Sequence, residues 1–302
     1  MSKKVLIIGG GIAGLSAGYF LKKSGYEPEI FEHHAIAGGL VTAWKRKGYT
    51  FEGCIHWLVG SSPDDPGFRK LWEELGYFPS IEIVDHEIFT RIEGNNGEYL
   101  NVYSDADRFQ QELLRVSPED KKYIIRFIKG VKKLSKWQMR LNPPASLMSG
   151  KEKMKMMAGI VPFMGEFRKW SKLSVSEYAS NFKSDFLKKA FKSILGMGES
   201  MIFILMTLAW LHRKNAGYPI GGSLKMIGSI ENKYKKLGGK IRFNSTVKKI
   251  IVENDTAVGI ILENGEEIRG DIVISAADGH STLFEMLPKK YLTDEFRDYY
   301  SG

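Results

Sequence analysis

The sequence has one cysteine and no long apolar run. Because Cys54 is alone among 302 residues, an internal disulfide framework is excluded and a reducing, cytoplasmic location is expected. No stretch approaches the roughly 18 consecutive apolar residues that a membrane-spanning helix needs. The longest apolar run, from Met201 to Leu211, predicts a buried helix. With 43% hydrophobic and 26% charged residues, the composition is that of a globular protein.

Acidic residues are scarce in one segment, which carries the net positive charge of the chain. Between Lys129 and Lys172, eleven Lys and Arg stand against two acids, a balance of 11 − 2 = +9 that equals the net charge of the whole chain. This local excess predicts a partner surface and not general nucleic-acid binding, since no zinc-ligand spacing or RNA-recognition signature accompanies it. Apolar side chains lie among these cations: Met148, Met154, Met156, Met157, Phe163, Met164, Phe167 and Trp170. Such a segment fits either peripheral contact with an anionic membrane or a lid with a solvated basic face.

The N-terminal stretch predicts a nucleotide-binding turn and not a secretory leader. The apolar residues 5–8 predict a strand buried on both faces. They lead into Gly9, Gly11 and Gly14 at G-x-G-x-x-G spacing, which allows a tight turn, close approach of a pyrophosphate and close helix packing. A helix over residues 12–24 would direct its free N–H groups at that pyrophosphate. The glycines also interrupt the apolar core that a leader requires.

An acidic residue follows the second predicted strand, residues 29–31. Glu32 lies eighteen positions after Gly14, near the spacing at which an acid accepts the ribose hydroxyls of a dinucleotide. No Lys-Ser or Lys-Thr pair follows the glycines, which excludes a P-loop. Six residues after Glu32, Gly38 and Gly39 would let the backbone pass close to an extended ligand such as FAD, although a plain loop could contain the same pair.

The C-terminal third predicts more elements of the same kind. A helical pattern follows Gly221 and Gly222 and ends at Gly238 and Gly239; its apolar positions are Leu224, Ile227, Ile230 and Tyr234. Strands are predicted over residues 241–243, 247–252 and 258–262, with a hairpin turn at Asn264-Gly265. Asp271 opens another strand that we expect to be buried on both faces.

Four blocks of the sequence resemble the FAD-dependent amine-oxidase and phytoene-desaturase superfamily, in particular the branch of carotenoid desaturases, carotenoid isomerases and retinol saturases. The blocks are residues 9–32 with 37–40 and 48–57, residues 117–128, residues 217–266, and residues 271–288. "YPIGG" at residues 218–222 is among the more specific motifs. The resemblance implies FAD as the cofactor. It also implies a late glycine-rich segment that these 302 residues do not contain, so we expect the family's C-terminal part to be lacking.

The resemblance also assigns residues to the cofactor. The fingerprint would hold the pyrophosphate and Glu32 the ribose, while backbone near Gly39 would follow the flavin chain. Val247 would border the adenine, Ser275 and Ala276 the ADP part, and His56 the flavin ring. The predicted cofactor-binding residues are Gly9, Gly11, Ile12, Ala13, Gly14, Glu32, His33, Gly38, Gly39, Leu40, His56, Val247, Ser275 and Ala276.

The chemistry of such a flavoprotein needs no conspicuous catalytic group, because flavin carries the redox step. His56 is the one catalytic candidate, and the alternative is a packed or capping histidine. Cys54 is expected to be a small buried hydrophobe. No metal site is predicted, since His33-His34 has no partner at ligand spacing and is expected at the surface.

The predicted fold is α/β: a Rossmann-like FAD-binding domain, a parallel sheet with helices and a β-meander, with an inserted α+β substrate domain. The first domain would comprise residues 1–76 and 216–302, and the basic, helix-rich substrate or lid domain residues 77–215. In the insert, strands are expected near residues 82–92 and 99–103. Helix starts are expected at Ser104 or Asp105, at residues 117–120, and at the capping box of Ser174 and Glu177.

The sequence thus predicts an FAD-dependent oxidoreductase that desaturates, saturates or isomerises a long apolar unsaturated substrate of carotenoid, retinoid or isoprenoid type. Its expected partners are that lipophilic molecule and an anionic membrane surface contacted through residues 129–172. One alternative is a flavin amine oxidase or other small-substrate oxidase. Another is a non-catalytic nucleotide- or flavin-binding protein, or a membrane-associated one.

Overall fold

The computed structural model describes residues 2–65, 67–95, 97–141, 143–144, 146–194 and 200–300. The chain divides into two compact units. The first comprises Met1–His56, Glu73–Ile81 and Gly221–Gly302, and the second Trp57–Trp72 and Glu82–Ile220.

These units differ from the predicted domain boundaries at residues 57–72, 77–81 and 216–220. For residues 57–72 and 216–220 the reason is strand pairing: β5 (Leu58–Val59) and β6 (Ile83–Val84) both pair antiparallel with β9 (Ala216–Pro219). This small sheet, in the order β5-β9-β6, ties residues on both sides of the predicted boundaries to the second unit.

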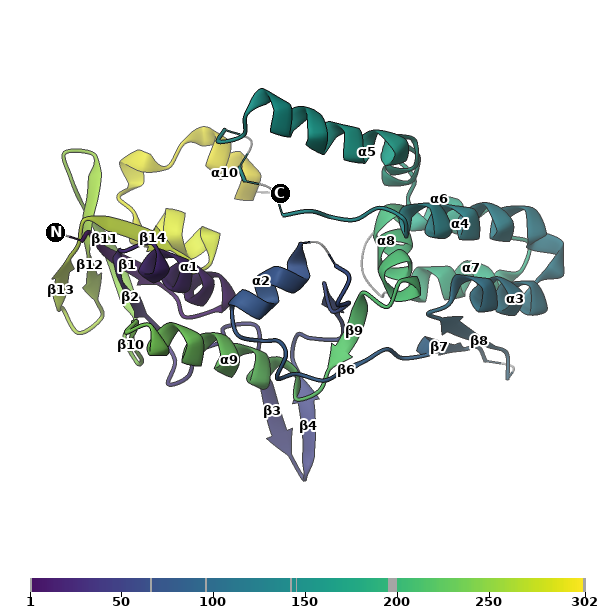
Figure 1. Ribbon diagram of the computed structural model, residues 1–302, viewed down its shortest axis with the longest axis horizontal. Helices are drawn as coiled ribbons and strands as arrows, with labels where there is room; N and C mark the ends of the chain where they lie inside the picture. The colour runs from purple at the N-terminus through teal and green to yellow at the C-terminus, as the bar shows by residue number, and fades with distance from the viewer. Residues whose placement is uncertain are drawn as a thin grey trace. The chain divides into compact units, whose positions relative to one another are not determined.

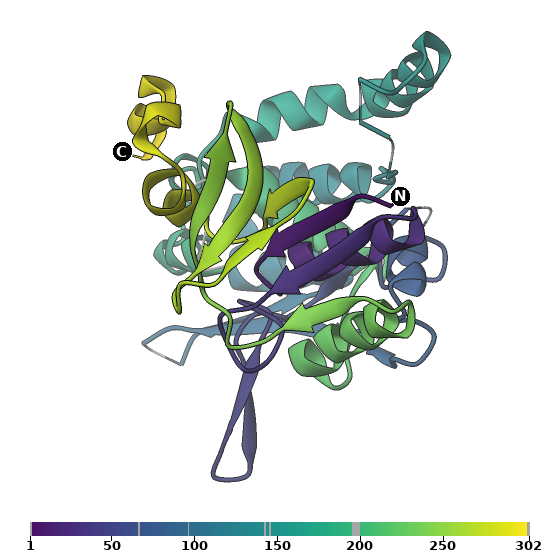
Figure 2. The same ribbon diagram turned by 90° about the vertical axis from the view of Figure 1, so that its left-hand side faces the viewer.

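The first unit is built on a four-stranded parallel sheet in the order β10-β2-β1-β14 (Figures 1 and 2). Its strands are β1 (Lys4–Ile8), β2 (Glu27–Phe31), β10 (Lys240–Arg242) and β14 (Ile272–Ser275). The central strand β1 is buried on both faces, as its continuous apolar run predicts. The expectation for β14 is wrong: it lies at the edge of the sheet, and all its residues are only half-buried.

Two layers cover this sheet. On one face, Leu6 and Ile8 pack against a meander of β11 (Val247–Glu253), β12 (Thr256–Leu262) and β13 (Glu267–Arg269). On the other, α1 (Ile12–Lys23) and α9 (Gly222–Lys236) pack together. A Cβ at Gly18 of α1 would lie 3.1 Å from Ile30 and from the Tyr234 ring, so this glycine allows α1 close to both neighbours. The predicted α/β architecture with a β-meander is confirmed.

At the amino end of α9, two glycines meet the carboxylate of a neighbouring hairpin. Gly221 and Gly222 have left-handed φ values of +96° and +56°. A Cβ at Gly222 would overlap the Glu52 carboxylate, which accepts the N–H of Ser223 at 3.0 Å. Glu52 is the last residue of β4 (Tyr49–Glu52), which forms a hairpin with β3 (Ala43–Arg46). Gly222 of "YPIGG" therefore makes room for a carboxylate cap from the hairpin.

Four further helical elements are short. They are α2 (Phe68–Glu74), the π-helix η2 (Ser281–Met286), the 3₁₀-helix η3 (Lys289–Tyr291) and α10 (Asp294–Tyr300). Cys54 is exposed, so the prediction of a buried thiol is wrong: it lies in the irregular segment between β4 and β5.

The second unit is mostly helical and carries a β7–β8 hairpin. Its elements are β7 (Ile88–Glu93), β8 (Tyr99–Tyr103), α3 (Ala106–Val116), the 3₁₀-helix η1 (Pro118–Asp120), α4 (Lys121–Leu134), α5 (Gly150–Ser171), α6 (Val175–Ala179), α7 (Asp185–Ser193) and α8 (Met201–His212). Helix α8 is buried along most of its length, as its apolar run predicts. Aromatic rings form the centre of the core: Phe109, Phe127, Tyr178, Phe182 and Phe191.

The predicted helix starts are present. Asp105 caps α3 by accepting the N–H groups of Asp107 and Arg108, and Ser174 with Glu177 forms the capping box of α6. A second capping box, Ser149 with Glu152, starts α5. Within the described residues, no helix is both long and apolar enough to cross a bilayer.

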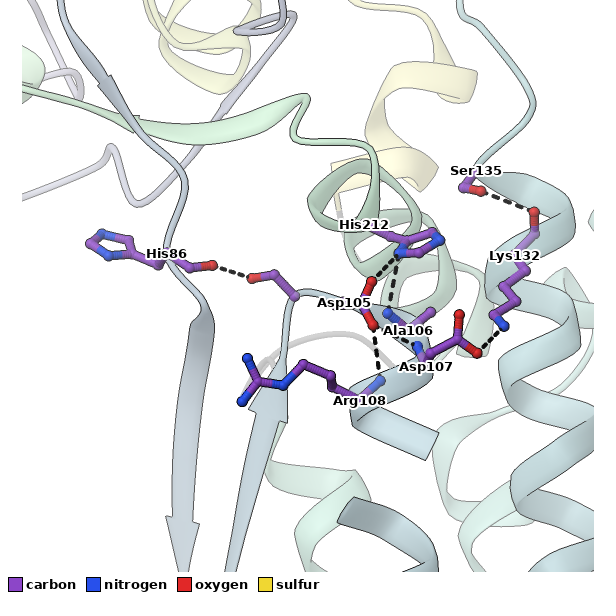
Figure 3. Close-up of polar contacts among 9 residues, drawn as sticks. His86, Asp105, Ala106, Asp107, Arg108, Lys132, Ser135 and His212 are labelled. Atoms are coloured by element: carbon purple, nitrogen blue, oxygen red, sulfur yellow. Dashed lines mark hydrogen bonds and ion pairs between the residues drawn. The ribbon is translucent and has the colours of Figure 1, made fainter. Parts of the chain in front are cut away.

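A histidine at the end of α8 ties that helix to the start of α3 (Figure 3). His212 Nδ1 accepts the N–H of Ala106 at 3.1 Å and lies 3.5 Å from Asp105 Oδ2. Because Nδ1 accepts, the proton of the neutral ring lies on Nε2. Asp107 of the same turn pairs with Lys132 of α4. These contacts join three helices and are structural.

Gly130 fixes how closely α4 approaches its neighbours. A Cβ there would lie 2.7 Å from Leu205 and 2.9 Å from Trp170 Nε1. We expect Gly130→Ala to lower the free energy of unfolding by about 1–3 kcal/mol, because overpacking outweighs the gain in helix propensity. Gly165→Ala in α5 is the matched control, since a Cβ there meets nothing within 4 Å; it should raise stability by about 0.5–1 kcal/mol. Urea unfolding followed by circular dichroism measures both, and shifts of the same sign would contradict the packing argument.

Candidate functional site

A cavity of about 770 Å³ lies in the first unit where β1 ends and α1 begins. Ligands of open α/β sheets bind at this carboxyl edge, and the volume is in the range of small-molecule sites. The lining comes from five segments: Ile8, Gly9, Gly11, Ile12 and Ala13; Phe31, Glu32, His33 and His34; Gly38, Gly39, Leu40 and Val41; Ser245, Thr246 and Val247; and Ala276, Ala277, Asp278, Ser281 and Met286.

The amino end of α1 has no side-chain cap. Gly11 occupies the capping position with extended backbone, no side chain accepts from the first turn, and that turn contains no acid. Its free N–H groups and the positive end of the helix dipole therefore remain available to an anion. No Lys or Arg is among the described residues that line the cavity. The positive potential for a pyrophosphate must come from backbone.

The fingerprint glycines have separate roles. Gly9 has a left-handed φ of +97°, which turns the chain out of β1. Gly14 lies behind the cavity wall, where a Cβ would come 2.0 Å from the Gly9 oxygen. Any larger residue at position 14 would therefore push α1 away from β1, so Gly14 acts on the site by placing the helix.

Gly38 and Gly39 pack directly on the fingerprint. The Gly38 N–H donates to the Gly10 oxygen at 3.0 Å, and a Cβ at Gly39 would lie 3.4 Å from the Gly11 Cα. A Cβ at Gly38, whose φ is +134°, would meet the Val41 oxygen at 2.8 Å. The left-handed φ values of +134° at Gly38 and +57° at Gly39 account for the pair without a ligand, and both residues also line the cavity.

Glu32 binds the glycine loop. Its side chain is 5% exposed; Oε2 accepts the Gly10 N–H at 2.6 Å and Oε1 the His34 N–H at 2.8 Å. Charge-assisted bonds of this kind are stronger than neutral ones. A carboxylate has about four lone-pair sites, so two remain for ribose hydroxyls. The contact with Gly10 was not foreseen from the sequence.

The cavity brings together every predicted cofactor-binding residue except Gly14, Ser275 and His56. The hydroxyls of Ser275 and Thr282 lie 2.7 Å apart. His56 is exposed and is not among the described lining residues. His33 is exposed as predicted and also lines the cavity, with Nδ1 2.6 Å from Thr246 Oγ1.

Several lining residues were missed from the sequence: Ser245, Thr246, Ala277, Asp278, Ser281 and Met286. They follow β10 and β14, so the rule that parallel strands present their carboxyl ends at one edge could have found them. Asp278 Oδ2 accepts the Ser281 N–H at 2.8 Å, and this bond holds the pKa of Asp278 below its usual range. The resulting negative charge favours hydroxyl groups over phosphate beside it.

Substitutions of Glu32 test whether this side chain binds both FAD and the glycine loop. We expect Glu32→Gln to weaken FAD binding by about 10–100-fold, because one charged acceptor becomes an amide. Glu32→Ala should also lower the free energy of unfolding by about 1–3 kcal/mol, since it leaves the buried Gly10 N–H without its acceptor. Flavin absorbance per mole and urea unfolding measure the two effects. The control is Glu29→Gln, in the strand β2 that Glu32 follows but outside the cavity. Equal flavin loss in both Gln variants would contradict the assignment of Glu32.

Curated relatives match nearly the whole chain at low identity. It is 25% identical over 96% of its length to the inactive all-trans-retinol 13,14-reductase of Danio rerio, covering 50% of that protein. It is 24% identical over 96% to phytoene desaturase (neurosporene-forming) of Cereibacter sphaeroides, with 56% covered. Prolycopene isomerase of Daucus carota is 25% identical over 96%, with 48% covered. The chain therefore spans about half the length of these relatives.

Solved structures share the fold. An oxidoreductase from Methanosarcina mazei aligns with a TM-score of 0.56 and 23% identity, over 99% of this chain and 64% of that one. Wild-type putrescine oxidase bound to putrescine aligns with a TM-score of 0.63 and 16% identity, over 100% and 63%. At these identities the likeness concerns the fold alone.

The family itself is matched over residues 12–294, by the description "Flavin containing amine oxidoreductase". This range includes α1, the Gly38–Gly39 contact, the meander and β14. It confirms the predicted family and the predicted cofactor, FAD. The chain belongs to the flavin containing amine oxidoreductase family.

Proposed function

We propose that the protein is an FAD-dependent oxidoreductase that desaturates, saturates or isomerises a long apolar unsaturated molecule of carotenoid, retinoid or isoprenoid type. The observation that carries the flavin part is the cavity at the uncapped end of α1. The substrate class is supported by the names of the curated relatives, which include phytoene desaturases, prolycopene isomerases and retinol reductases.

In this proposal FAD supplies the redox chemistry when bound, and the chain supplies position. The N–H groups of the first turn of α1 would hold the pyrophosphate, and Glu32 would hold both the glycine loop and the ribose. Asp278, already charged, would stand beside hydroxyl groups. Desaturation releases a proton besides the hydride that the flavin takes, and saturation takes up both; in this proposal water carries that proton, so no catalytic histidine or carboxylate is assigned.

Two alternatives predict different behaviour. An amine oxidase would need a site that accepts an ammonium group; the description of the matched family and the fold shared with putrescine oxidase favour this alternative. A non-catalytic flavoprotein would bind FAD without turning over, and one relative is itself named inactive.

Anaerobic flavin spectroscopy separates the three. We expect a neutral polyene to bleach the FAD-loaded protein in a desaturation, or to reoxidise its dithionite-reduced form in a saturation. An isomerisation leaves the flavin spectrum unchanged, so chromatography of the recovered polyene is measured beside it. Putrescine and other amines should leave the spectrum unchanged. Hydrogen peroxide released in proportion to amine after air is admitted would favour the amine oxidase. A flavin that responds to dithionite, with no spectral response to any substrate and no altered polyene, would favour the non-catalytic protein.

We also propose that α5 lies on an anionic membrane. Four apolar side chains at spacings of three and four share one face of this helix and are exposed: Met154 by 73%, Met157 by 47%, Val161 by 56% and Met164 by 48%. Phe167 and Trp170, outside this stripe, pack into the core of the second unit. An apolar stripe left outside is typical of a helix in a bilayer interface.

The charged residues of α5 also suit contact with an anionic membrane. Exposed cations lie near both ends of the helix: Lys151, Lys153, Lys155, Arg168 and Lys172. Its two acids are engaged, Glu152 in the capping box and Glu166 with the Trp170 N–H. Each lysine or arginine near anionic lipid contributes about 1 kcal/mol, screened over about 8–10 Å at physiological salt.

Vesicle sedimentation tests this surface. We expect pelleting with vesicles that contain phosphatidylserine, little with neutral vesicles, and less at high salt. The double variant Met157→Gln/Val161→Gln should lower the pelleted fraction at every salt concentration, because it removes apolar area and no charge. Leu224→Gln, an exposed apolar position on α9, is the control. Pelleting that is negligible in all conditions, or equally reduced by the control, would overturn the proposal.

A further inference from the structure

A second, cationic hollow of about 350 Å³ lies in the second unit between α4 and the last turns of α5. Its charged lining consists of Lys122, Arg126, Lys129 and Lys169, with one acid, Glu166. It shares no residue with the cofactor cavity of the first unit.

Three of these cations form one row on α4. Lys122, Arg126 and Lys129 are spaced by four and three residues, so they project from the same face of the helix. In the part of the chain that the structure describes, no ion pair is formed by any of the three. Like charges at this spacing repel one another. An anion in the hollow would relieve that repulsion.

A buried tryptophan lies beside two of the cations that line the hollow. Trp170 is fully buried, and Gly130 allows α4 to approach it. The Arg126 guanidinium carbon lies 5.7 Å from the centre of the Trp170 ring, and Lys169 Nζ lies 4.4 Å from it. Both cations are thus placed by one rigid ring, which reduces the entropy lost when they bind an anion.

The single acid does not neutralise the row on α4. Glu166 Oε2 accepts the Trp170 Nε1–H at 2.7 Å, and its oxygens lie 3.5 Å from Lys133 Nζ and 3.6 Å from Lys169 Nζ. Burial raises the pKa of Glu166, but the Trp170 bond and the two lysines outweigh it, so the pKa lies below its usual range. The carboxylate is charged and already paired with other groups.

We propose that this hollow binds a phosphate group. The planar fork of Arg126 fits two phosphate oxygens, and Lys122 and Lys129 add compact charges on either side. A phosphate monoester carries about −1.5 to −2 charges near neutral pH, which matches a row of three unpaired cations. The phosphate can belong to a soluble molecule or to a lipid headgroup. The proposal goes beyond the flavin function and does not depend on it.

Isothermal titration calorimetry of the FAD-saturated chain tests the hollow, since bound FAD keeps the end of α1 from competing. The probes are inorganic phosphate, dihexanoyl phosphatidic acid, and vesicles with or without phosphatidic acid. We expect at least one phosphate probe to bind with Kd below about 1 mM. Arg126→Gln/Lys129→Gln should weaken this binding about tenfold or more. Lys129→Gln alone should weaken it in the same direction without disturbing the Trp170 ring.

The matched control is Lys183→Gln/Lys192→Gln, which removes the same charge from exposed positions of the second unit outside the hollow. Binding changed less than about twofold by this control supports a defined site. A soluble phosphate that binds as tightly as the lipid assigns the site to a soluble ligand, whereas binding gained only with phosphatidic acid assigns it to a headgroup. Binding of no phosphate probe, or an equal loss in control and hollow variants, would overturn the proposal.

Discussion

The contact between Gly14 and the Gly9 carbonyl is the constraint on which the cofactor site depends. Because the Cβ that position 14 lacks would come within 2.0 Å of that oxygen, α1 can start directly above the end of β1. This places the uncapped first turn of α1 at the cavity edge. The same tight turn brings the Gly10 N–H to Glu32 and the Gly10 oxygen to Gly38. Glycines and one carboxylate thus build the site largely from backbone.

The elements of the first unit were predictable because each has a strong local cause. A continuous apolar run in β1, a glycine exit after α9 and Asn264-Gly265 between β12 and β13 all correspond to observed features. The strand β14 was predicted, but its edge position and half-burial were not. A run of apolar residues is the same whether a strand lies inside a sheet or at its edge. Exposure of Cys54 likewise depends on tertiary context, which no local pattern records.

The cofactor-binding residues were predictable to the extent that they follow strands or belong to the fingerprint. Glu32 lines the cavity, and its role at the ribose stays a prediction; its bond to Gly10 comes from the turn geometry and not from spacing. Gly38 and Gly39 were interpreted through a ligand, and the structure adds a local reason in their left-handed φ values. His56 was assigned by resemblance alone and is not among the described lining residues.

The cavity at α1 and the proposed phosphate site on α4 would attract an anion through different groups. The cavity at α1 has no lysine or arginine in its described lining and depends on N–H groups and a helix dipole, which are fixed in place and partly shielded from solvent. The row on α4 consists of exposed side chains whose attraction for an anion is screened over about a Debye length. Salt should therefore weaken contacts of the second unit far more than cofactor binding in the first. The excess charge of the chain is confined to residues 129–172, none of which is among the described residues that line the cavity.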